Sequence, residues 1–497
     1  MASIDFARLR NQTMADGLDS EVTVNTRALI DKVLARYSSE HTTLRELIQN
    51  AADAKANTVT IRLETDPSLS IPTPQGAEDP VLLRHIIQNH TLKRLVVTNN
   101  GQPFTTADWS RLKSIADGNP DETKIGAFGV GFYSVFADCD EPFVVSGDKT
   151  MAFYWKGNTL STKISSVPAD HDTTMTIFSL DYRQANPASP SYSPSKLPNL
   201  PDLCQFLATS LTFVGLESIE LHVDDYVVAS FSKKISPPED VRVPQGLKTE
   251  TEGGLMRVMH VTRQHSQIDA EWLNVIASAQ LPPKRAADLV QQEVRNAGTT
   301  LRSFFSKFST PAPQPASKAV KPAPTEKLSS DQAVAGESKG IIFLQVYTVE
   351  ASTKVSQKFA AEIERATKKS PPKSTKIALL TSPYQDPSAM LTTGTGSTAE
   401  LATKIFAEVL PTKSGRIFIG FPTAQTTGYL AHISAPSLIP TVERENVDMN
   451  ARYISTWNIE LLRVAGLACR ISYVSEMAEI QARVKVESVD ALVPRAI

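Results

Sequence analysis

The 497-residue sequence has few cysteines, no surplus of charge of one sign and no long hydrophobic run. Its cysteines, Cys139, Cys204 and Cys469, lie far apart without a CxxC pair, which argues against a disulfide framework or a zinc site and fits a reducing compartment. Lysine and arginine total 51 against 53 acidic residues, a net charge of −2, so nucleic acid and anionic membranes are disfavoured as partners. The N-terminal segment MASIDFARLR has no apolar signal region, and no apolar run has the length of a bilayer span. We therefore expect a soluble cytoplasmic protein, with the nucleus as an alternative, and no membrane partner.

The remaining composition, 41% hydrophobic and 21% charged, is that of an ordinary globular protein. Helix-like and strand-like patterns over residues 1–185 predict a first α/β unit, and a Pro/Ser-rich stretch opens a second unit over 186–305. Residues 306–340 are rich in Pro, Ala, Ser and Lys and poor in aromatics, which predicts a disordered linker. Strand and helix patterns resume over 341–497, where we expect the second unit to continue.

The segment LRELIQNAADA, which starts at Leu44, aligns three polar residues on one helical face. Glu46, Asn50 and Asp53 are spaced i, i+4 and i+7, and apolar residues occupy the opposite face. Periodicity alone favours an amphipathic helix whose polar side faces water. The rest of the unit suggests a different use for that face.

A second motif, KIGAFGVGFYSVF, places Gly126, Gly129 and Gly131 ahead of a predicted helix, FYSVFA. Glycines allow close backbone approach, and a helix N-terminus offers unpaired N–H groups, so together they suit a phosphate. A glycine-rich turn alone is most often only a turn. Here it follows the polar helix and the strand-end turn TNNG within one α/β unit, which favours a nucleotide site.

The two strings together resemble the nucleotide-binding domain of the GHKL ATPases, and in particular the ninety-kilodalton heat-shock chaperones, over roughly residues 20–180. A second, more diverged resemblance covers GRIFIGFPTAQTTGYLAHISAPSLIPTVERENVD and the later WNIELL, which are similar to the region after the ATPase domain in the sacsin family. The resemblance implies an α+β fold. Its first part, 1–185, would be a two-layer α/β sandwich of GHKL type, an antiparallel or mixed sheet with helices on one face. An α/β middle-type domain would follow in two parts, 186–305 and a sacsin-like 341–497.

The resemblance also implies roles for the polar helix. Glu46 corresponds to the general base that polarises the attacking water, and Asn50 to the Mg²⁺ ligand. Asp53 corresponds to the polar residue near the sugar and phosphate edge of the nucleotide. The phosphates would be contacted by the backbone of Gly126, Gly129, Val130, Gly131 and Phe132.

The adenine end of the implied site departs from the family pattern. The family usually has Asp-x-Gly-x-Gly where this chain has Asn99, Gly101 and then Pro103. A neutral Asn99 still accepts a hydrogen bond from the adenine amino group, but more weakly than an aspartate, so we expect weaker or less adenine-selective binding. Thr174 matches the threonine that supports adenine recognition, although an ordinary strand threonine explains it equally well.

Two basic residues are candidates for the γ-phosphate. Lys124 directly precedes the phosphate glycines, and a solvated lysine is the equal alternative. Arg444, in TVEREN, occupies the turn from which a second domain of the chaperones supplies an arginine that stabilises charge during phosphoryl transfer. A plain surface arginine is the alternative there.

The leading interpretation is a chaperone-like ATPase of the sacsin class that binds and hydrolyses ATP with Mg²⁺ to drive conformational cycling. The implied partners are ATP and ADP, client proteins of unknown identity, and a second copy through the N-terminal domain. One alternative is a nucleotide-sensing interaction module with little or no turnover. A DNA-acting GHKL relative is a third, disfavoured by the near-neutral charge.

Overall fold

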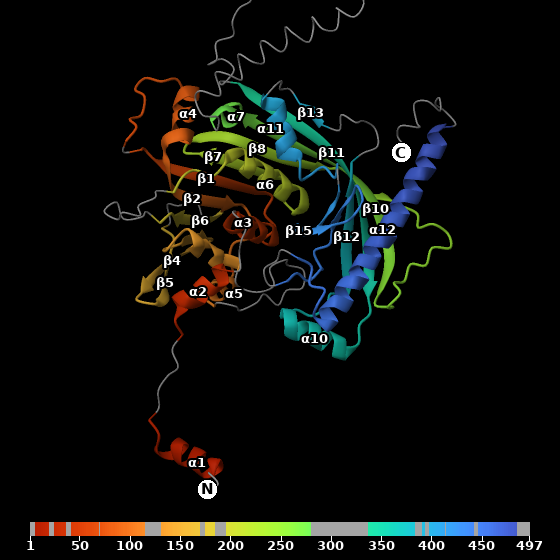
Figure 1. The fold of residues 1–497 in the computed structure, drawn as a ribbon, viewed down its shortest axis with the longest axis horizontal. Helices are drawn as coiled ribbons and strands as arrows, with labels where there is room; N and C mark the ends of the chain where they lie inside the picture. The colour runs from red at the N-terminus through yellow and green to blue at the C-terminus, as the bar shows by residue number, and fades with distance from the viewer. Residues whose placement is uncertain are drawn as a thin grey trace, which may run out of the picture.

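A computed structural model of the chain (Figure 1) describes most of its residues. The described ranges are 5–18, 24–35, 41–68, 70–114, 131–168, 174–183, 195–279, 336–382, 390–392, 397–412, 414–441 and 446–484.

Helices and strands are mixed along the described part of the chain. The helices are α1 (Phe6–Asp16), α2 (Thr26–Leu34), α3 (Thr42–Asp53), α4 (Asp79–Asn89), α5 (Thr106–Leu112), the 3₁₀ helix η1 (Gly131–Ala137), α6 (Leu200–Phe213), α7 (Val275–Ala279), α10 (Gln357–Thr367), α11 (Ser397–Phe406) and α12 (Arg452–Val484). The strands are β1 (Thr58–Asp66), β2 (Thr91–Asn99), β3 (Phe143–Ser146), β4 (Lys149–Lys156), β5 (Thr159–Ser166), β6 (Thr176–Asp181), β7 (Ser218–Val223), β8 (Tyr226–Ile235), β9 (Glu239–Asp240), β10 (Met256–Leu273), β11 (Glu337–Thr353), β12 (Ser374–Thr381), β13 (Met390–Thr392), β14 (Arg416–Ile419), β15 (Phe421–Thr426) and β16 (His432–Ser434). None of the described helices is both long enough and apolar enough to cross a membrane.

Within the described residues, all strands belong to one sheet. Its order is β15-β14-β16-β12-β11-β10-β8-β7-β1-β2-β6-β3-β4-β5, with β13 beside β11 and β9 beside β10. Most neighbours are antiparallel, but β1 runs parallel to β7 and β14 runs parallel to β16. This mixed sheet with helices confirms the predicted α+β class; the GHKL fold remains a prediction.

The β1–β7 pair joins the N-terminal strands to the rest of the sheet. Residues 58–63 pair with residues 218–223, so the sheet passes the predicted boundary at position 186 without a break. The predicted domain limits stay predictions. Of the predicted linker 306–340, the part up to position 335 lies outside the described residues, and residues 337–340 already belong to β11.

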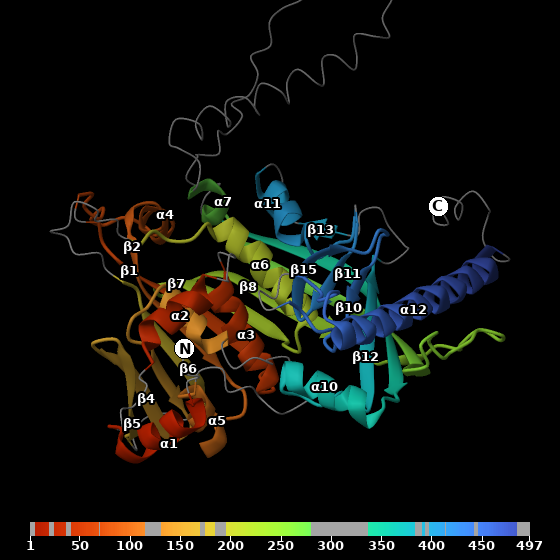
Figure 2. The same cartoon turned by 60° about the horizontal axis from the view of Figure 1, so that its bottom comes forward.

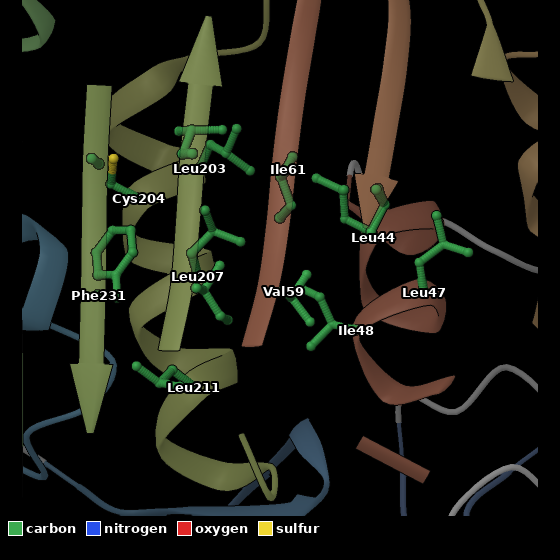
Figure 3. Packing of buried hydrophobic residues seen from close by; sticks show 14 of the residues in the cluster. Leu44, Leu47, Ile48, Val59, Ile61, Leu203, Cys204, Leu207, Leu211 and Phe231 are labelled. Atoms are coloured by element: carbon green, nitrogen blue, oxygen red, sulfur yellow. The ribbon is translucent and has the colours of Figure 1, made fainter. Parts of the chain in front are cut away.

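Apolar residues of α3 and α6 cover the N-terminal half of the sheet. Figure 3 shows Leu44, Leu47 and Ile48 of α3 beside Val59 and Ile61 of β1. On α6, Leu203, Leu207 and Leu211 are fully buried over β7 and β8. Burial of each such side chain contributes about 1.5–3 kcal/mol relative to exposure, which fixes the position of α3 on the sheet.

Helix α12 covers the C-terminal half of the sheet. It crosses the long strands β10, β11 and β12 (Figures 1 and 2), and its buried residues Trp457, Leu461, Val464 and Ala468 form a second hydrophobic cluster with them.

The glycine-rich segment shows one difference from expectation. The residues FYSVFA form a 3₁₀ helix rather than an α-helix, and five of the seven residues of η1 are buried, so tertiary packing dominates over helical propensity there.

Candidate functional site

The polar face of α3 turns inward. Glu46 is only 3% exposed, while Asn50 and Asp53 are half-buried. The helix is held on this side by η1, because the Thr43 hydroxyl donates to the Ser134 carbonyl at 3.2 Å. A polar face directed into bulk water is therefore wrong for Glu46, and a carboxylate buried this deeply requires polar partners.

Glu46 lies directly against the first residue of η1. A Cβ atom built on Gly131 would stand 3.0 Å from the Glu46 Cδ and would overlap its Oε2. The absence of a side chain at Gly131 is thus what makes room for the carboxylate. On its other side, Glu46 Oε1 is 3.7 Å from Arg45 Nε. The structure therefore brings Glu46 of the first motif into contact with Gly131 of the second.

Asn50 lies one turn after Glu46 on α3 and carries a half-buried side-chain amide. Its backbone carbonyl accepts from the Ala54 N–H at 3.0 Å, as in any helix. Among the described residues, no cluster of three or more histidine, cysteine or acidic side chains could hold a metal.

The strand-end turn after β2 packs on the C-terminal end of α3. Asn99 is 2% exposed, and its Oδ1 accepts from the Gly101 N–H at 3.0 Å. A Cβ on Gly101 would lie 2.8 Å from the Ala54 Cβ, so this position requires glycine. The Gln102 N–H donates to the Ala54 carbonyl at 2.7 Å. These contacts place Asn99 within the same unit as α3.

The second asparagine of the turn has a structural task. Asn100 Oδ1 accepts from the N–H groups of Asn57 and Thr58 at 2.9 and 3.0 Å. It thereby fixes the start of β1 against the end of β2. The two asparagines therefore stabilise different backbone segments, Asn99 its own turn and Asn100 the start of β1.

A pair of hydroxyl groups lies beside Asn99 and was not predicted. Thr176 on β6 is directly opposite Asn99 on β2, and its Oγ1 is 2.7 Å from the Ser146 Oγ. The Phe104 N–H donates to the same Ser146 oxygen at 2.9 Å. Strand alternation from Phe178 back to Thr176 is the signal that would have identified the inward-facing threonine.

Gln49 is a second residue that sequence reasoning missed. It lies on α3 between Glu46 and Asn50, is 4% exposed, and its Nε2 is buried without a hydrogen-bond partner. A buried amide nitrogen without a partner is uncommon in native proteins. The spacing of three residues from Glu46 places it on the edge of the same helical face.

The other predicted residues fall in three groups. Phe132 is 8% exposed and packs with Tyr133, Phe153 and Phe178. Thr174 is exposed, two residues before β6 begins. The predicted residues that lie outside the described part of the chain are Lys124, Gly126, Gly129, Val130 and Arg444.

The residues that flank Arg444 are held by hydrogen bonds. The Thr441 N–H donates to the Asn446 carbonyl at 2.8 Å. The side chain of Gln425, on β15, bonds to the Asn446 side chain at 3.1 Å and accepts from the Val447 N–H at 3.1 Å. Thr441 and Asn446 are therefore bonded to each other, and Asn446 is bonded to β15.

The WNIELL motif anchors the same loop from α12. The Trp457 Nε1–H donates to the Ser437 carbonyl at 2.9 Å. Asn458, fully buried, accepts from the Ile439 N–H and donates to the carbonyls of Ile439 and Asp448, each at 2.8 Å. The motif therefore serves to fix the loop rather than to contact a ligand.

Aromatic contacts link α3 to the C-terminal strands. The ring of His41, directly before α3, is 4.9 Å from that of Phe206 on α6. Phe206 in turn stacks on Phe421 of β15 at 6.2 Å. Because Gln425 on the same strand bonds to Asn446 and Val447, these contacts connect the residues after position 445 to the helix that carries Glu46.

Two family profiles match the sequence. The family described as "Protein of unknown function (DUF3684)" matches residues 211–494, more than half of the chain. The profile described as "Sacsin domain" matches residues 23–192, the part that contains α3 and the phosphate glycines.

Individual relatives align with about a quarter of the chain. Sacsin of Homo sapiens is 35% identical over 119 residues, which are 24% of this chain and 2% of sacsin. The chaperone protein HtpG of Methylobacterium sp. (strain 4-46) is 37% identical over 131 residues, and that of Methylobacterium nodulans is 36% identical over 131 residues. In both cases the match covers 24% of this chain and 21% of the relative. The predicted resemblance to sacsin-like and heat-shock-chaperone ATPases is therefore confirmed, although the chain spans only a small part of each relative.

Proposed function

Because the chain belongs to the family described as "Protein of unknown function (DUF3684)" and has a sacsin-like N-terminal part, we propose that it is a chaperone-like ATPase. In this proposal, Mg-ATP binds against the inward face of α3 and its hydrolysis drives a conformational cycle. Client proteins and self-association through the N-terminal part belong to the same proposal. The names of two relatives, which are chaperone proteins, support the client proteins, and self-association rests on the family resemblance alone.

One observation carries the proposal: the Glu46 carboxylate is buried against Gly131. Gly131 is the last glycine of the motif proposed to contact the phosphates. A carboxylate at this position can accept a proton from a water aligned with the γ-phosphate, which is the task of a general base. The buried environment also excludes other water molecules and keeps the carboxylate in one orientation.

Asn50 fits the role of a metal ligand. Its side-chain amide is half-buried on the same helix as Glu46, and a neutral oxygen suits a hard cation that keeps several waters. When bound, Mg²⁺ would neutralise charge on the phosphate oxygens. Asp53, one turn further on, is half-buried on the same helical face and would bind on the sugar and phosphate side.

Arg444 is proposed to stabilise charge at the γ-phosphate. The support is indirect: Gln425 and Asn446 hold its segment, and contacts through Phe206 connect that strand to α3. A guanidinium delivered there would offset the negative charge of the transferred phosphoryl group. Lys124 is proposed to contact the γ-phosphate of bound ATP before the reaction.

The first test is the substitution Glu46→Ala, assayed by steady-state phosphate release from Mg-ATP together with ATP affinity. Loss of a general base reduces turnover by about a hundredfold or more, whereas affinity stays close to that of the parent. The matched control is Glu78→Ala, an exposed glutamate at the start of α4 that makes no capping bond. Loss of ATP binding together with turnover would make the general-base assignment wrong.

The same measurement distinguishes the ATPase from the second candidate function, a nucleotide-sensing module with little turnover. The ion pair between Arg45 and Glu46 favours it, because a carboxylate directed at an arginine must turn before it can orient a water. ATP binding without phosphate release in the parent and in both variants would select this candidate. Attention would then move to the surface that nucleotide binding reshapes.

A further inference from the structure

The outer side of α12 carries an apolar stripe. The helix is 33 residues long and lies on the outside of the sheet (Figures 1 and 2). The stripe positions recur every seven residues, which is close to two helical turns, so they share one side of the helix; they are Ile459, Gly466, Tyr473 and Ile480. Ile459 is 36% and Tyr473 is 59% exposed. An apolar stripe on the solvent side of a helix is typical of a contact surface.

Gly466 lies at the centre of this stripe. A Cβ atom built on it meets no atom within 4 Å, so the helix surface is open there. Glycine is unfavourable in a helix interior, but it allows another backbone to approach closely. Two large apolar side chains, Ile459 and Tyr473, stand seven residues before and seven residues after it. The stripe is therefore arranged symmetrically about its smallest residue.

We propose that this stripe is an interface with a second copy of the chain, in which two α12 helices cross antiparallel at Gly466. A two-fold axis at Gly466 places Ile459 of each copy opposite Tyr473 of the other, because both residues are equally far from the axis. Such a contact is self-complementary and closes as a dimer. The inference does not depend on the proposed ATPase function. It also differs from self-association through the N-terminal part, since it uses a helix of the C-terminal part.

The charges beside the stripe fit the same arrangement. Arg470, four residues after Gly466, is exposed. Glu252, whose side chain is 81% exposed, bonds at 2.6 Å to Arg463, three residues before Gly466. In an antiparallel pair centred on Gly466, these two positions lie side by side along one edge, so Arg470 of one copy approaches Glu252 of the other. A parallel pair would bring the two Arg470 side chains to the same height, which their like charge disfavours.

The size of the stripe predicts a weak and reversible dimer. From residue 459 to residue 480 the helix rises about 32 Å, and a helix is about 10 Å wide. Two copies would therefore bury on the order of 1,000 Å² in total, which is at the low end for specific protein interfaces. We expect a dissociation constant on the order of 10 µM.

The first experiment is sedimentation velocity of the full chain without nucleotide, from about 1 to 100 µM. The parent should pass from monomer to dimer over this range. Tyr473→Lys introduces a charge into the apolar contact and should raise the dissociation constant about tenfold or more. The fold should persist, because Tyr473 is mostly exposed. The matched control Ala478→Lys adds the same charge at an exposed position on another side of α12 and should dimerise like the parent.

Disulfide cross-linking tests the antiparallel register, in a Cys469→Ser background because Cys469 is a free thiol near Gly466. Helices about 8–10 Å apart bring facing Cα atoms to about 4–5 Å, close enough for a disulfide. Under a mild oxidant, Gly466→Cys should therefore link two copies. Ile459→Cys should not link to itself, since its two copies would be about 21 Å apart along the pair. It should link to Tyr473→Cys when the two variants are mixed.

Three results would overturn the inference. The first is a parent that stays monomeric at about 100 µM, and the second is an unchanged dissociation constant in Tyr473→Lys. The third is self-linking of Ile459→Cys, which would show a parallel pair. All three leave the ATPase proposal standing, because phosphate release tests that proposal separately.

Discussion

The position of Glu46 depends on a residue that contributes no side chain. Gly131 lies so close that any Cβ there would overlap the carboxylate oxygen, and the surrounding residues of α3 and η1 are buried and cannot retreat. The glutamate and the glycine therefore constrain each other. This explains in physical terms why the two motifs that carry them occur together.

Gly131→Ala tests that constraint. The added methyl group displaces the Glu46 carboxylate, and a shift of about 1 Å in a catalytic group costs on the order of a hundredfold in rate. Phosphate release should therefore fall far more than ATP affinity. Gly215→Ala is the matched control, because a Cβ there meets no atom within 4 Å. Parental turnover in Gly131→Ala would contradict the proposed role of the contact.

At the residue scale, helical spacing predicted that Glu46, Asn50 and Asp53 share one helix, and α3 carries all three; their roles stay predictions. The inward orientation of Thr176 was not predicted, because it depends on the register of β6 against Asn99. Gln49 also escaped prediction, since a helical glutamine is usually exposed and only the packed structure shows that its Nε2 is buried without a partner.

At the scale of elements, α12 combines two tasks. Its first turns anchor loops: Asn458 holds the segment around residue 439, and the Glu460 carboxylate accepts from the N–H groups of Gly253 and Leu255 at 3.2 Å each. Its middle then covers β10 to β12. The helix, Arg452–Val484, extends beyond the WNIELL motif at both ends.

Gly466 is the weak point of this helix. It lies in the interior of α12, is exposed, and has no atom within 4 Å of a built Cβ. Gly466→Ala should raise the free energy of unfolding by about 0.5–1 kcal/mol, since alanine loses less backbone entropy in a helix. Urea unfolding followed by circular dichroism measures this. The contrasting variant Gly254→Ala, at φ +70°, should destabilise; an equal effect of both variants would refute the explanation.

At the scale of the whole molecule, the sheet joins parts that the sequence separates. The parallel pairing of β1 with β7 connects residues about 160 positions apart, a relation that local patterns do not contain. Strands and helices could be predicted because each depends on local alternation, and the α+β class was implied by the family resemblance. The continuity of the sheet could not, because it depends on which edges meet after folding.

His432 lies where the N-terminal and C-terminal parts pack together. Its ring contacts Phe213 of α6 and Phe418 of β14. The Arg416 N–H donates to Nδ1 at 3.0 Å, which leaves the hydrogen on Nε2 to donate to the Val409 carbonyl at 3.1 Å. Both nitrogens are thus used by the neutral ring, and protonation of Nδ1 would set two donors against each other.

This arrangement predicts acid sensitivity of the whole molecule. Burial lowers the pKa of His432 from 6.5 to about 4, so between these values the unfolded chain binds a proton that the folded chain does not. Stability is therefore fully present above pH 6.5 and is lost as pH falls toward 4. Each pKa unit corresponds to about 1.4 kcal/mol, so roughly 2 kcal/mol should be lost between pH 7.5 and pH 5.

The variant His432→Asn keeps an acceptor but does not titrate. In this variant, the difference between the urea unfolding free energies at pH 7.5 and pH 5 should shrink by roughly 2 kcal/mol. An unchanged pH dependence would show that the acid sensitivity of the fold arises from other groups.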